Sequence, residues 1–296
     1  MKMSKINAFL FILIASLIVI SCKKKDSPEP FNNYSFFVAG HTYGKPGGDH
    51  LGFHPPFKSE FSFIQIYPNN LFGILTGDIV QHSNEESWDI IDGEIEELGL
   101  PLFFAPGNHD TYNYELYKQR YGDPENDYRT YGYFRQENDI FILLDANIDE
   151  WNISDEQLIF LQNVLDSNMN GLNNVFVFVH QLIWWDEYTV FKNIVTNWPP
   201  YTPDTTNYWG TLETIFQNYQ TPVFLFAGDL GANDPATPYM YFVDNNITYI
   251  AGGMGSDNND NYLFVSVDEY GVVDFDLIAL QGSRDRFGKL EDYILP

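Results

Sequence analysis

Short apolar runs recur along the chain, and most of them end in a glycine or a polar cluster. Such runs are typical of central strands that are buried on both faces. They cover residues 34–39, 71–75, 102–105, 141–144, 175–179 and 223–227. Helix-like segments separate several runs, and one begins with Ser154 and Gln157 in the spacing of a capping box. Because strands without helices follow residue 247, the pattern predicts one α/β domain, residues 34–296, with two packed mixed β-sheets flanked by helices.

Polar residues gather where these predicted strands end. The first run leads into a glycine turn with His41 at its tip, and ligands of α/β sheets bind at that edge. All six histidines lie in or shortly after such a loop, and several carboxylates and an amide do the same. These residues are His41, His50, His54, His82, His109 and His180, together with Asp78, Asn108, Asp110 and Asp229. Any one of these histidines is more often a hydrogen-bonded loop residue, but their joint placement matches the ligands of zinc, iron or manganese.

The first 21 residues are predicted to be a signal peptide. Lysines precede about fifteen mostly apolar residues, a stretch shorter than the roughly 20 that cross a membrane comfortably. The only cysteine, Cys22, follows directly in "VISCKKKDSPEP", which resembles the lipobox of bacterial lipoproteins. We therefore expect an exported protein, lipid-anchored at Cys22 in a bacterial cell envelope, with residues 22–33 as a tether. The alternative is a signal anchor with a chance cysteine.

The charge of the chain restricts its partners. Without residues 1–21, 13 basic residues stand against 41 acidic ones. Phosphate backbones and anionic membrane surfaces are bound through basic patches, so we expect no nucleic acid partner and no membrane contact except through the lipid. Nothing in the sequence indicates an oligomeric state.

Four motifs occur in an order and spacing that resemble the calcineurin-like metallophosphoesterase family. They are "GD" at 77–78, "GNHD" at 107–110, His180 after an apolar strand, and "GD" at 228–229. The stretch 131–165 is also similar to the family's link between its third and fourth motifs. The resemblance spans about residues 34–280. It implies a four-layer αββα sandwich and metal-dependent hydrolysis of phosphomonoesters or phosphodiesters.

The resemblance also implies roles for single residues. Asp78 would bridge two metal ions, and a second site would be completed by Asn108, His180 and Asp229. The first site would keep Asp78 and His41, with Tyr43 as a candidate phenolate ligand. The ions would be one or two of manganese, iron or zinc.

This sequence departs from the family at two motifs. The first motif is usually Asp-x-His and the last His-x-His, whereas this chain has His41 with Tyr43 and Asp229 with Gly231. A carboxylate and an imidazole have therefore exchanged places, and one histidine is missing at Gly231. Asp49, His50 and His54, which share one loop, are candidates to replace that histidine as a metal ligand. Alternatively, this loop only covers the site.

Catalysis is assigned by the same resemblance. His109 would protonate or stabilise the leaving oxygen. Asp110 would orient His109 by accepting its other ring proton, or it would instead cap its own loop.

An aromatic segment after His180 has two interpretations. It would form a wall that stacks a sugar or a base, or it would pack over the sheet as an ordinary insertion. Its aromatic residues are Trp184, Trp185, Trp198, Tyr201, Tyr208 and Trp209.

Three functions remain open at this stage. The first is an exported lipoprotein that hydrolyses small-molecule or glycan-linked phosphoesters. The second is a binding protein that retains the fold and has lost turnover. The third is a surface protein that binds glycans, which only the aromatic segment suggests.

Overall fold

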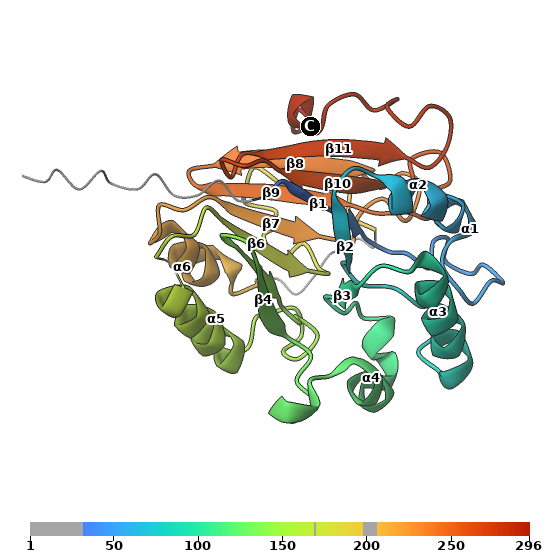
Figure 1. The fold of residues 1–296 in the computed structure, drawn as a ribbon, viewed down its shortest axis with the longest axis horizontal. Helices are drawn as coiled ribbons and strands as arrows, with labels where there is room; N and C mark the ends of the chain where they lie inside the picture. The colour runs from blue at the N-terminus through green and yellow to red at the C-terminus, as the bar shows by residue number, and fades with distance from the viewer. Residues whose placement is uncertain (1–31, 169, 198–205) are drawn as a thin grey trace, which may run out of the picture. The chain divides into compact units, whose positions relative to one another are not determined.

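The computed structural model describes residues 32–168, 170–197 and 206–296, which belong to one compact unit of the chain (Figure 1). The signal peptide, most of the tether, Cys22, Trp198 and Tyr201 lie outside the described residues. None of the helices in the described ranges is both long and apolar enough to cross a bilayer.

The first sheet is mixed and has the strand order β11-β10-β1-β2-β3. Its central strand, β1, pairs in parallel with β2 and antiparallel with β10. The strands are β1 (Tyr34–Ala39), β2 (Asn70–Leu75), β3 (Leu102–Phe104), β10 (Asn261–Val267) and β11 (Val273–Ala279). The carboxyl ends of β1, β2 and β3 therefore meet at one edge.

The second sheet is also mixed, with the order β4-β5-β6-β7-β9-β8. Its four inner strands are parallel, and β4 and β8 pair antiparallel at its two edges. The strands are β4 (Gly132–Gln136), β5 (Asp139–Leu143), β6 (Asn174–Val179), β7 (Val223–Ala227), β8 (Tyr239–Asp244) and β9 (Ile247–Gly252). The apolar runs predicted as central strands all fall within these two sheets or at their ends.

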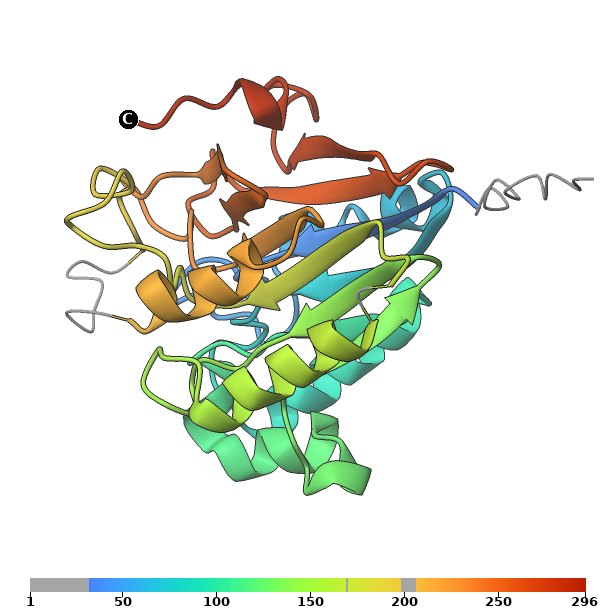
Figure 2. The same ribbon diagram turned by 90° about the vertical axis from the view of Figure 1, so that its left-hand side faces the viewer.

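Helices flank the two sheets on opposite sides (Figures 1 and 2). The helices are α1 (Pro55–Lys58), α2 (Phe61–Ile66), α3 (Glu85–Leu98), α4 (Tyr114–Tyr121), α5 (Asp155–Asn168) and α6 (Glu213–Gln217). Apolar residues of α1 to α3 pack with the first sheet, and those of α5 and α6 with the second. A third cluster, rich in phenylalanine, lies between the sheets. The prediction of two mixed β-sheets flanked by helices is confirmed.

The start of α5 differs from its prediction. Ser154 Oγ accepts from the backbone N–H of Gln157 at 3.4 Å, as in half of a capping box. The Gln157 side chain does not complete the box, because it pairs with both the N–H and the carbonyl of Asp145. Gln157 thus joins α5 to the loop after β5.

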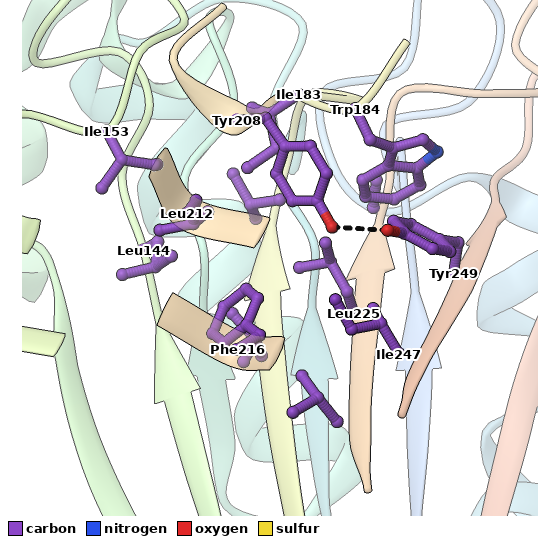
Figure 3. Close-up of a cluster of buried hydrophobic side chains, with 14 of the residues drawn as sticks. Leu144, Ile153, Ile183, Trp184, Tyr208, Leu212, Phe216, Leu225, Ile247 and Tyr249 are labelled. Carbon is purple, nitrogen blue, oxygen red and sulfur yellow. Dashed lines mark hydrogen bonds between the residues drawn. The ribbon is translucent and has the colours of Figure 1, made fainter. Parts of the chain in front are cut away.

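The aromatic segment after β6 packs mainly into the core. Figure 3 shows Trp184 and Tyr208 among aliphatic side chains between the second sheet and its helices. Both are fully buried, and the Tyr208 hydroxyl hydrogen-bonds to that of Tyr249 at 2.8 Å. Trp185 and Trp209 are partly buried against the same cluster. For these described residues the packing interpretation holds, and a substrate wall built from Trp184 and Tyr208 is excluded.

A buried carboxylate at the amino ends of the strands makes stability depend on pH. Asp139 accepts hydrogen bonds from the Tyr34 hydroxyl at 2.5 Å and from Asn174 Nδ2 at 2.8 Å. Burial raises the pKa of Asp139 to about 6, although both hydrogen bonds act to lower it. The folded state therefore holds this proton where the unfolded chain, with a pKa of about 3.9, has released it. The stabilisation is present below the unfolded pKa and is lost as pH rises through the folded pKa.

Asp139→Asn should remove this dependence. In the wild type, ionisation of Asp139 should lower the free energy of unfolding by roughly 1 kcal/mol between pH 5 and pH 7. Urea unfolding at the two pH values, in wild type and variant, measures the difference. An identical pH dependence in both proteins would show that Asp139 titrates normally.

Candidate functional site

Five loops meet where the carboxyl ends of β1, β2, β3, β6 and β7 come together. Backbone hydrogen bonds join them: His41 N–H donates to the Gly77 carbonyl at 3.0 Å, and Asp229 N–H donates to that of His180 at 3.0 Å. Glycine allows the two sheets to touch here, because a Cβ on Gly228 would lie 2.0 Å from the Thr76 carbonyl oxygen. A Cβ on Gly40 would likewise lie 2.5 Å from the Gly228 Cα. Side chains from both sheets therefore project into one small volume.

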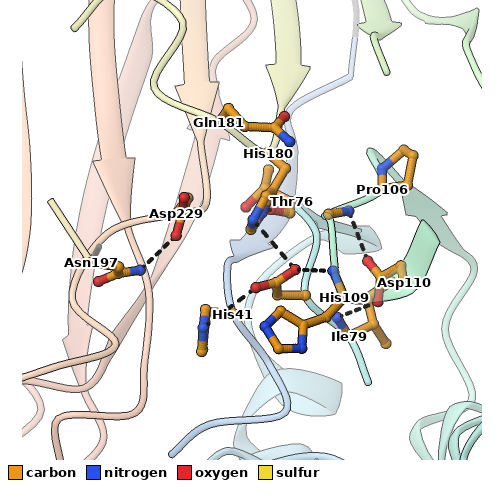
Figure 4. Close-up of polar contacts among 12 residues, drawn as sticks. His41, Thr76, Ile79, Pro106, His109, Asp110, His180, Gln181, Asn197 and Asp229 are labelled. Atoms are coloured by element: carbon orange, nitrogen blue, oxygen red, sulfur yellow. Dashed lines mark hydrogen bonds and ion pairs between the residues drawn. The ribbon is translucent and has the colours of Figure 1, made fainter. Parts of the chain in front are cut away.

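Asp78 is the centre of this group. Figure 4 shows the side chains of His41, His109 and His180 gathered at this edge. The Asp78 side chain is almost fully buried, and its two oxygens face different histidines. Oδ2 lies 3.5 Å from His41 Nε2, and Oδ1 lies 3.4 Å from His180 Nε2. Oδ1 also accepts from the backbone N–H of His109 at 3.1 Å. Burial alone would raise the pKa of Asp78, but the His180, His41 and His109 imidazoles outweigh it and hold the pKa below its usual value.

The tautomer of His180 follows from its hydrogen bond. His180 Nδ1 lies 2.8 Å from the Thr76 carbonyl oxygen, and a carbonyl only accepts, so Nδ1 carries the proton. In neutral His180, the Nε2 lone pair then faces the Asp78 carboxylate. This buried Nε2 has no hydrogen-bond partner among the described residues. Burial would lower the pKa of His180, but Asp78 and Asp229 outweigh it and raise the pKa. The pair therefore favours a positive charge, a proton or a metal ion, between its facing atoms.

His41 is held in the neutral form that binds metals. It is buried in the loop after β1, and burial lowers its pKa even though Asp78 acts to raise it. Its Nδ1 has no hydrogen-bond partner within the described ranges. The Tyr43 ring lies 4.3 Å from the His41 ring. Burial, followed by Asp78 and Asp229, raises the pKa of Tyr43 far above its usual value, so a phenolate ligand would need a cation to offset that cost.

Asp229 approaches the site from β7, and its orientation depends on Asn197. Asn197 Nδ2 donates to Asp229 Oδ1 at 2.8 Å, while Asn197 Oδ1 accepts from the Ala232 N–H at 2.7 Å. The sequence contained no signal for Asn197, which lies in the insertion after β6. This hydrogen bond leaves Oδ2 of the carboxylate available to a ligand.

Asn108 lies exposed on the loop after β3. In the described part of the chain its side chain has no hydrogen bond to Asp78 or His180. Within that same part, no group of three or more His, Cys, Asp or Glu side chains forms a closed metal-binding arrangement. The assignment of Asp78, Asn108, His180 and Asp229 as the ligands of one site stays a prediction.

Pairs of these residues nevertheless fit a divalent ion. Two atoms that each lie about 2.1 Å from a tetrahedral ion are about 3.4 Å apart. The two imidazole–carboxylate separations, 3.4 and 3.5 Å, agree with that spacing, and each uses a different oxygen of Asp78. The paired donors are nitrogen and oxygen atoms, which zinc, iron and manganese accept.

His109 and Asp110 have separate roles in the loop after β3. His109 Nδ1 lies 2.8 Å from the Gln81 carbonyl oxygen, so Nδ1 donates and only Nε2 is free. Asp110 is fully buried and accepts from the backbone N–H groups of Ile79, Val80 and Gly107 at 2.8, 3.1 and 2.8 Å. Burial and the Asp78 charge raise the pKa of Asp110 to about 7. The carbonyl of Gln81 thus takes the orienting position predicted for Asp110, and Asp110 caps the loop, as the alternative stated.

The loop proposed to replace the missing histidine makes other contacts. His50 Nε2 donates to the Tyr43 carbonyl at 2.6 Å, and His54 Nε2 pairs with the buried Asp260 carboxylate at 2.9 Å. Asp49 is exposed. These contacts match the alternative in which the loop covers and supports the site.

The missing histidine is also excluded by the backbone at Gly231. This glycine has φ +77°, and a Cβ there would lie 2.8 Å from the Pro238 carbonyl oxygen. A histidine would be strained at that position. The local backbone conformation therefore accounts for glycine, instead of the family's histidine ligand, at position 231.

A pocket of about 350 Å³ opens beside His109. It is lined by Gln81, His82, Asn108, His109 and Tyr112.

A family model and several solved structures are similar to this chain. A family model described as "Calcineurin-like phosphoesterase" matches residues 48–228, more than half of the 296-residue chain. A search of curated proteins gave no match.

Two solved structures share the fold. A dimetal phosphatase from Danio rerio is 13% identical with a TM-score of 0.57, and the match covers 84% of this chain and 99% of that chain. A purple acid phosphatase from yellow lupin (Lupinus luteus) seeds is 14% identical with a TM-score of 0.63, and the match covers 84% of this chain. It covers 52% of the lupin chain, so this chain spans about half of that protein.

Proposed function

Since the chain belongs to the calcineurin-like phosphoesterase family, we propose that it hydrolyses phosphomonoesters or phosphodiesters with one or two metal ions held at Asp78. The family match confirms the resemblance drawn from the motifs, and the family implies divalent metal ions. The observation that carries the proposal is the buried His180 Nε2 facing the Asp78 carboxylate. This pair favours a positive charge between its facing atoms, and a divalent metal ion supplies one.

The residues divide into two groups around Asp78. His180, Asp229 and Asn108 would hold one ion with Asp78. His41 would hold a second ion with Asp78, with Tyr43 beside it. When bound, such ions lower the pKa of water to supply hydroxide and hold the phosphoryl oxygens.

His109 supplies the proton that the leaving oxygen needs. Its Nδ1 proton is held by the Gln81 carbonyl, so proton donation must come from Nε2 of the imidazolium form. Asp110 keeps this loop in place through its three backbone hydrogen bonds. The proton passes from Nε2 to the departing alcohol, and solvent restores it.

Metal content and ester hydrolysis test the proposal together. The protein is stripped with a chelator, reloaded with manganese, zinc or iron, and assayed with nitrophenyl phosphate and bis(nitrophenyl) phosphate. We expect one or two ions per chain and turnover with at least one metal. An absence of turnover above the Asp78→Asn variant at every metal loading would overturn the hydrolase.

A binding protein without turnover is the second candidate, and one observation favours it. Gly231 cannot accept the family's histidine without strain, so the His41 side of the site has fewer ligands. Bound metal without turnover would support this function. The glycan-binding alternative loses its basis among the described residues, because Trp184 and Tyr208 are buried.

We also propose that the protein is exported and anchored through lipid on Cys22. The support is the position of the only cysteine directly after a short apolar segment. Cys22→Ser should move the protein from the detergent phase to the aqueous phase in a phase-partition experiment, because the lipid attachment site is removed. Unchanged partitioning would contradict the anchor.

A further inference from the structure

We propose that the pocket beside His109 receives the alcohol part of the ester, and that Tyr112 stacks on a flat ring in that alcohol. This inference rests on the proposed hydrolase function. The pocket is called the leaving-group pocket below and consists of Gln81, His82, Asn108, His109 and Tyr112. The preferred substrates are then phosphate monoesters of nucleosides or of other uncharged, ring-bearing alcohols.

The position of the pocket follows from His109. This residue lines the pocket, and the Gln81 carbonyl occupies its Nδ1. Only Nε2 is left to meet a ligand. The group that receives the proton from Nε2 is the leaving oxygen, so the alcohol attached to that oxygen lies in this pocket.

Tyr112 has no packing role in the described fold. Its relative exposure is 91%, the highest of the large hydrophobic residues among those described. The ring nevertheless lies on a well-fixed turn, residues Asp110–Asn113. Asp110 anchors the start of this turn, and the Thr111 N–H and hydroxyl both donate to the Gly107 carbonyl, at 3.1 and 3.0 Å. An exposed aromatic ring that a hydrogen-bonded turn carries beside a pocket is suited to stacking on another ring.

The charge and size of the pocket further restrict the chemical class of the ligand. The described residues that line it include no lysine or arginine. Because polyphosphates and nucleic acids are bound through cationic groups, the alcohol part is uncharged. The amide of Gln81 and the imidazole of His82 suit hydroxyl groups such as those of a sugar. A volume of about 350 Å³ falls in the range of small-molecule sites.

The experiment compares ring-bearing and ring-free substrates in the metal-loaded protein. Adenosine monophosphate, phenyl phosphate, glycerol phosphate and adenosine triphosphate are assayed with wild type, Tyr112→Ala and Tyr112→Phe. Stacking on one ring changes affinity by about tenfold. We expect Tyr112→Ala to lower kcat/KM about tenfold for the two ring-bearing monoesters, mainly through KM, and to leave glycerol phosphate unchanged. Tyr112→Phe should retain the wild-type values, and adenosine triphosphate should be the poorer nucleotide.

Tyr270 provides the matched control, because it is an exposed tyrosine on the turn between β10 and β11. Tyr270→Ala should change none of these values. Equal losses for all four substrates in Tyr112→Ala, or no loss for either ring-bearing monoester, would overturn the proposal. A preference for adenosine monophosphate over phenyl phosphate identifies a nucleoside as the occupant, and the reverse identifies an aryl alcohol.

A binding measurement separates this inference from the hydrolase function. Saturation-transfer NMR with adenosine and phenol reports occupancy of the pocket without turnover. If the wild type binds adenosine or phenol and Tyr112→Ala does not, the result supports ring binding in the leaving-group pocket, even if no ester is hydrolysed. Hydrolysis without any ring contact or ring preference overturns the pocket and leaves the hydrolase function in place.

Discussion

Asp78→Asn should empty both metal positions and lower ester hydrolysis by at least about 10³-fold. Asparagine keeps the size of the side chain and can still accept the His109 N–H, but it lacks the negative charge that faces both His41 and His180. Residue 78 has φ +53°, a conformation that asparagine tolerates better than alanine does. The change therefore tests the charge with little disturbance of the loop. Metal analysis of the purified variant and steady-state assays measure the two effects.

Two further variants serve as comparisons for the Asp78→Asn experiment. Asp139→Asn makes the same change in another buried carboxylate, at the opposite ends of the strands, and should keep both metal and activity. His41→Asn should reduce the metal content by no more than about one ion, because His180 faces the other oxygen of Asp78. Full metal occupancy in Asp78→Asn would contradict the assignment of Asp78 as the shared ligand.

His109→Asn should slow hydrolysis of an alkyl phosphate ester by about 10²- to 10⁴-fold, with a smaller effect on a nitrophenyl ester. The amide Nδ2 of asparagine can replace Nδ1 in the hydrogen bond to the Gln81 carbonyl, while Nε2 is removed. Nitrophenolate leaves with little help from a proton, and an alkoxide does not. Metal content should stay at the wild-type value, because His109 is not a proposed ligand.

The His109→Ala variant separates proton donation from loop support. Alanine removes both Nε2 and the hydrogen bond to Gln81, whereas asparagine removes only Nε2. Similar rates in the two variants would show that Nε2 carries the effect. Near wild-type rates in His109→Asn would contradict the acid role and leave His109 as an anchor of its loop.

Central strands such as β1, β5 and β6 could be predicted because they are buried on both faces. Continuous apolar runs such as 175–179 have few other stable placements, and their shared carboxyl edge follows from parallel pairing. The start of α5 at Ser154 includes a contact that a local sequence pattern cannot predict. Its capping-box spacing was correct, but Gln157 pairs with the backbone of Asp145, a contact made by tertiary packing.

In the candidate site, too, some residues could be predicted from the sequence and others could not. The motifs indicated that His41, Asp78, His180 and Asp229 gather at one edge, and the structure places them there. Two supporting groups had no signal in the sequence. The Gln81 carbonyl belongs to the backbone, which every residue carries, and Asn197 reaches Asp229 from an insertion whose path no local pattern specifies.

The glycine contact between the sheets also has a consequence for how the protein would acquire the proposed metal ions. The backbones at Gly40, Gly228 and Thr76 approach so closely that neither sheet can shift without separating the loops that carry Asp78 and His180. A folding intermediate with only one sheet formed lacks some of the proposed donor atoms, so it could not bind the ion as the finished protein would. On the proposed function, metal capture would therefore be a late event in maturation. A bound ion would then join the two sheets and slow their separation during unfolding.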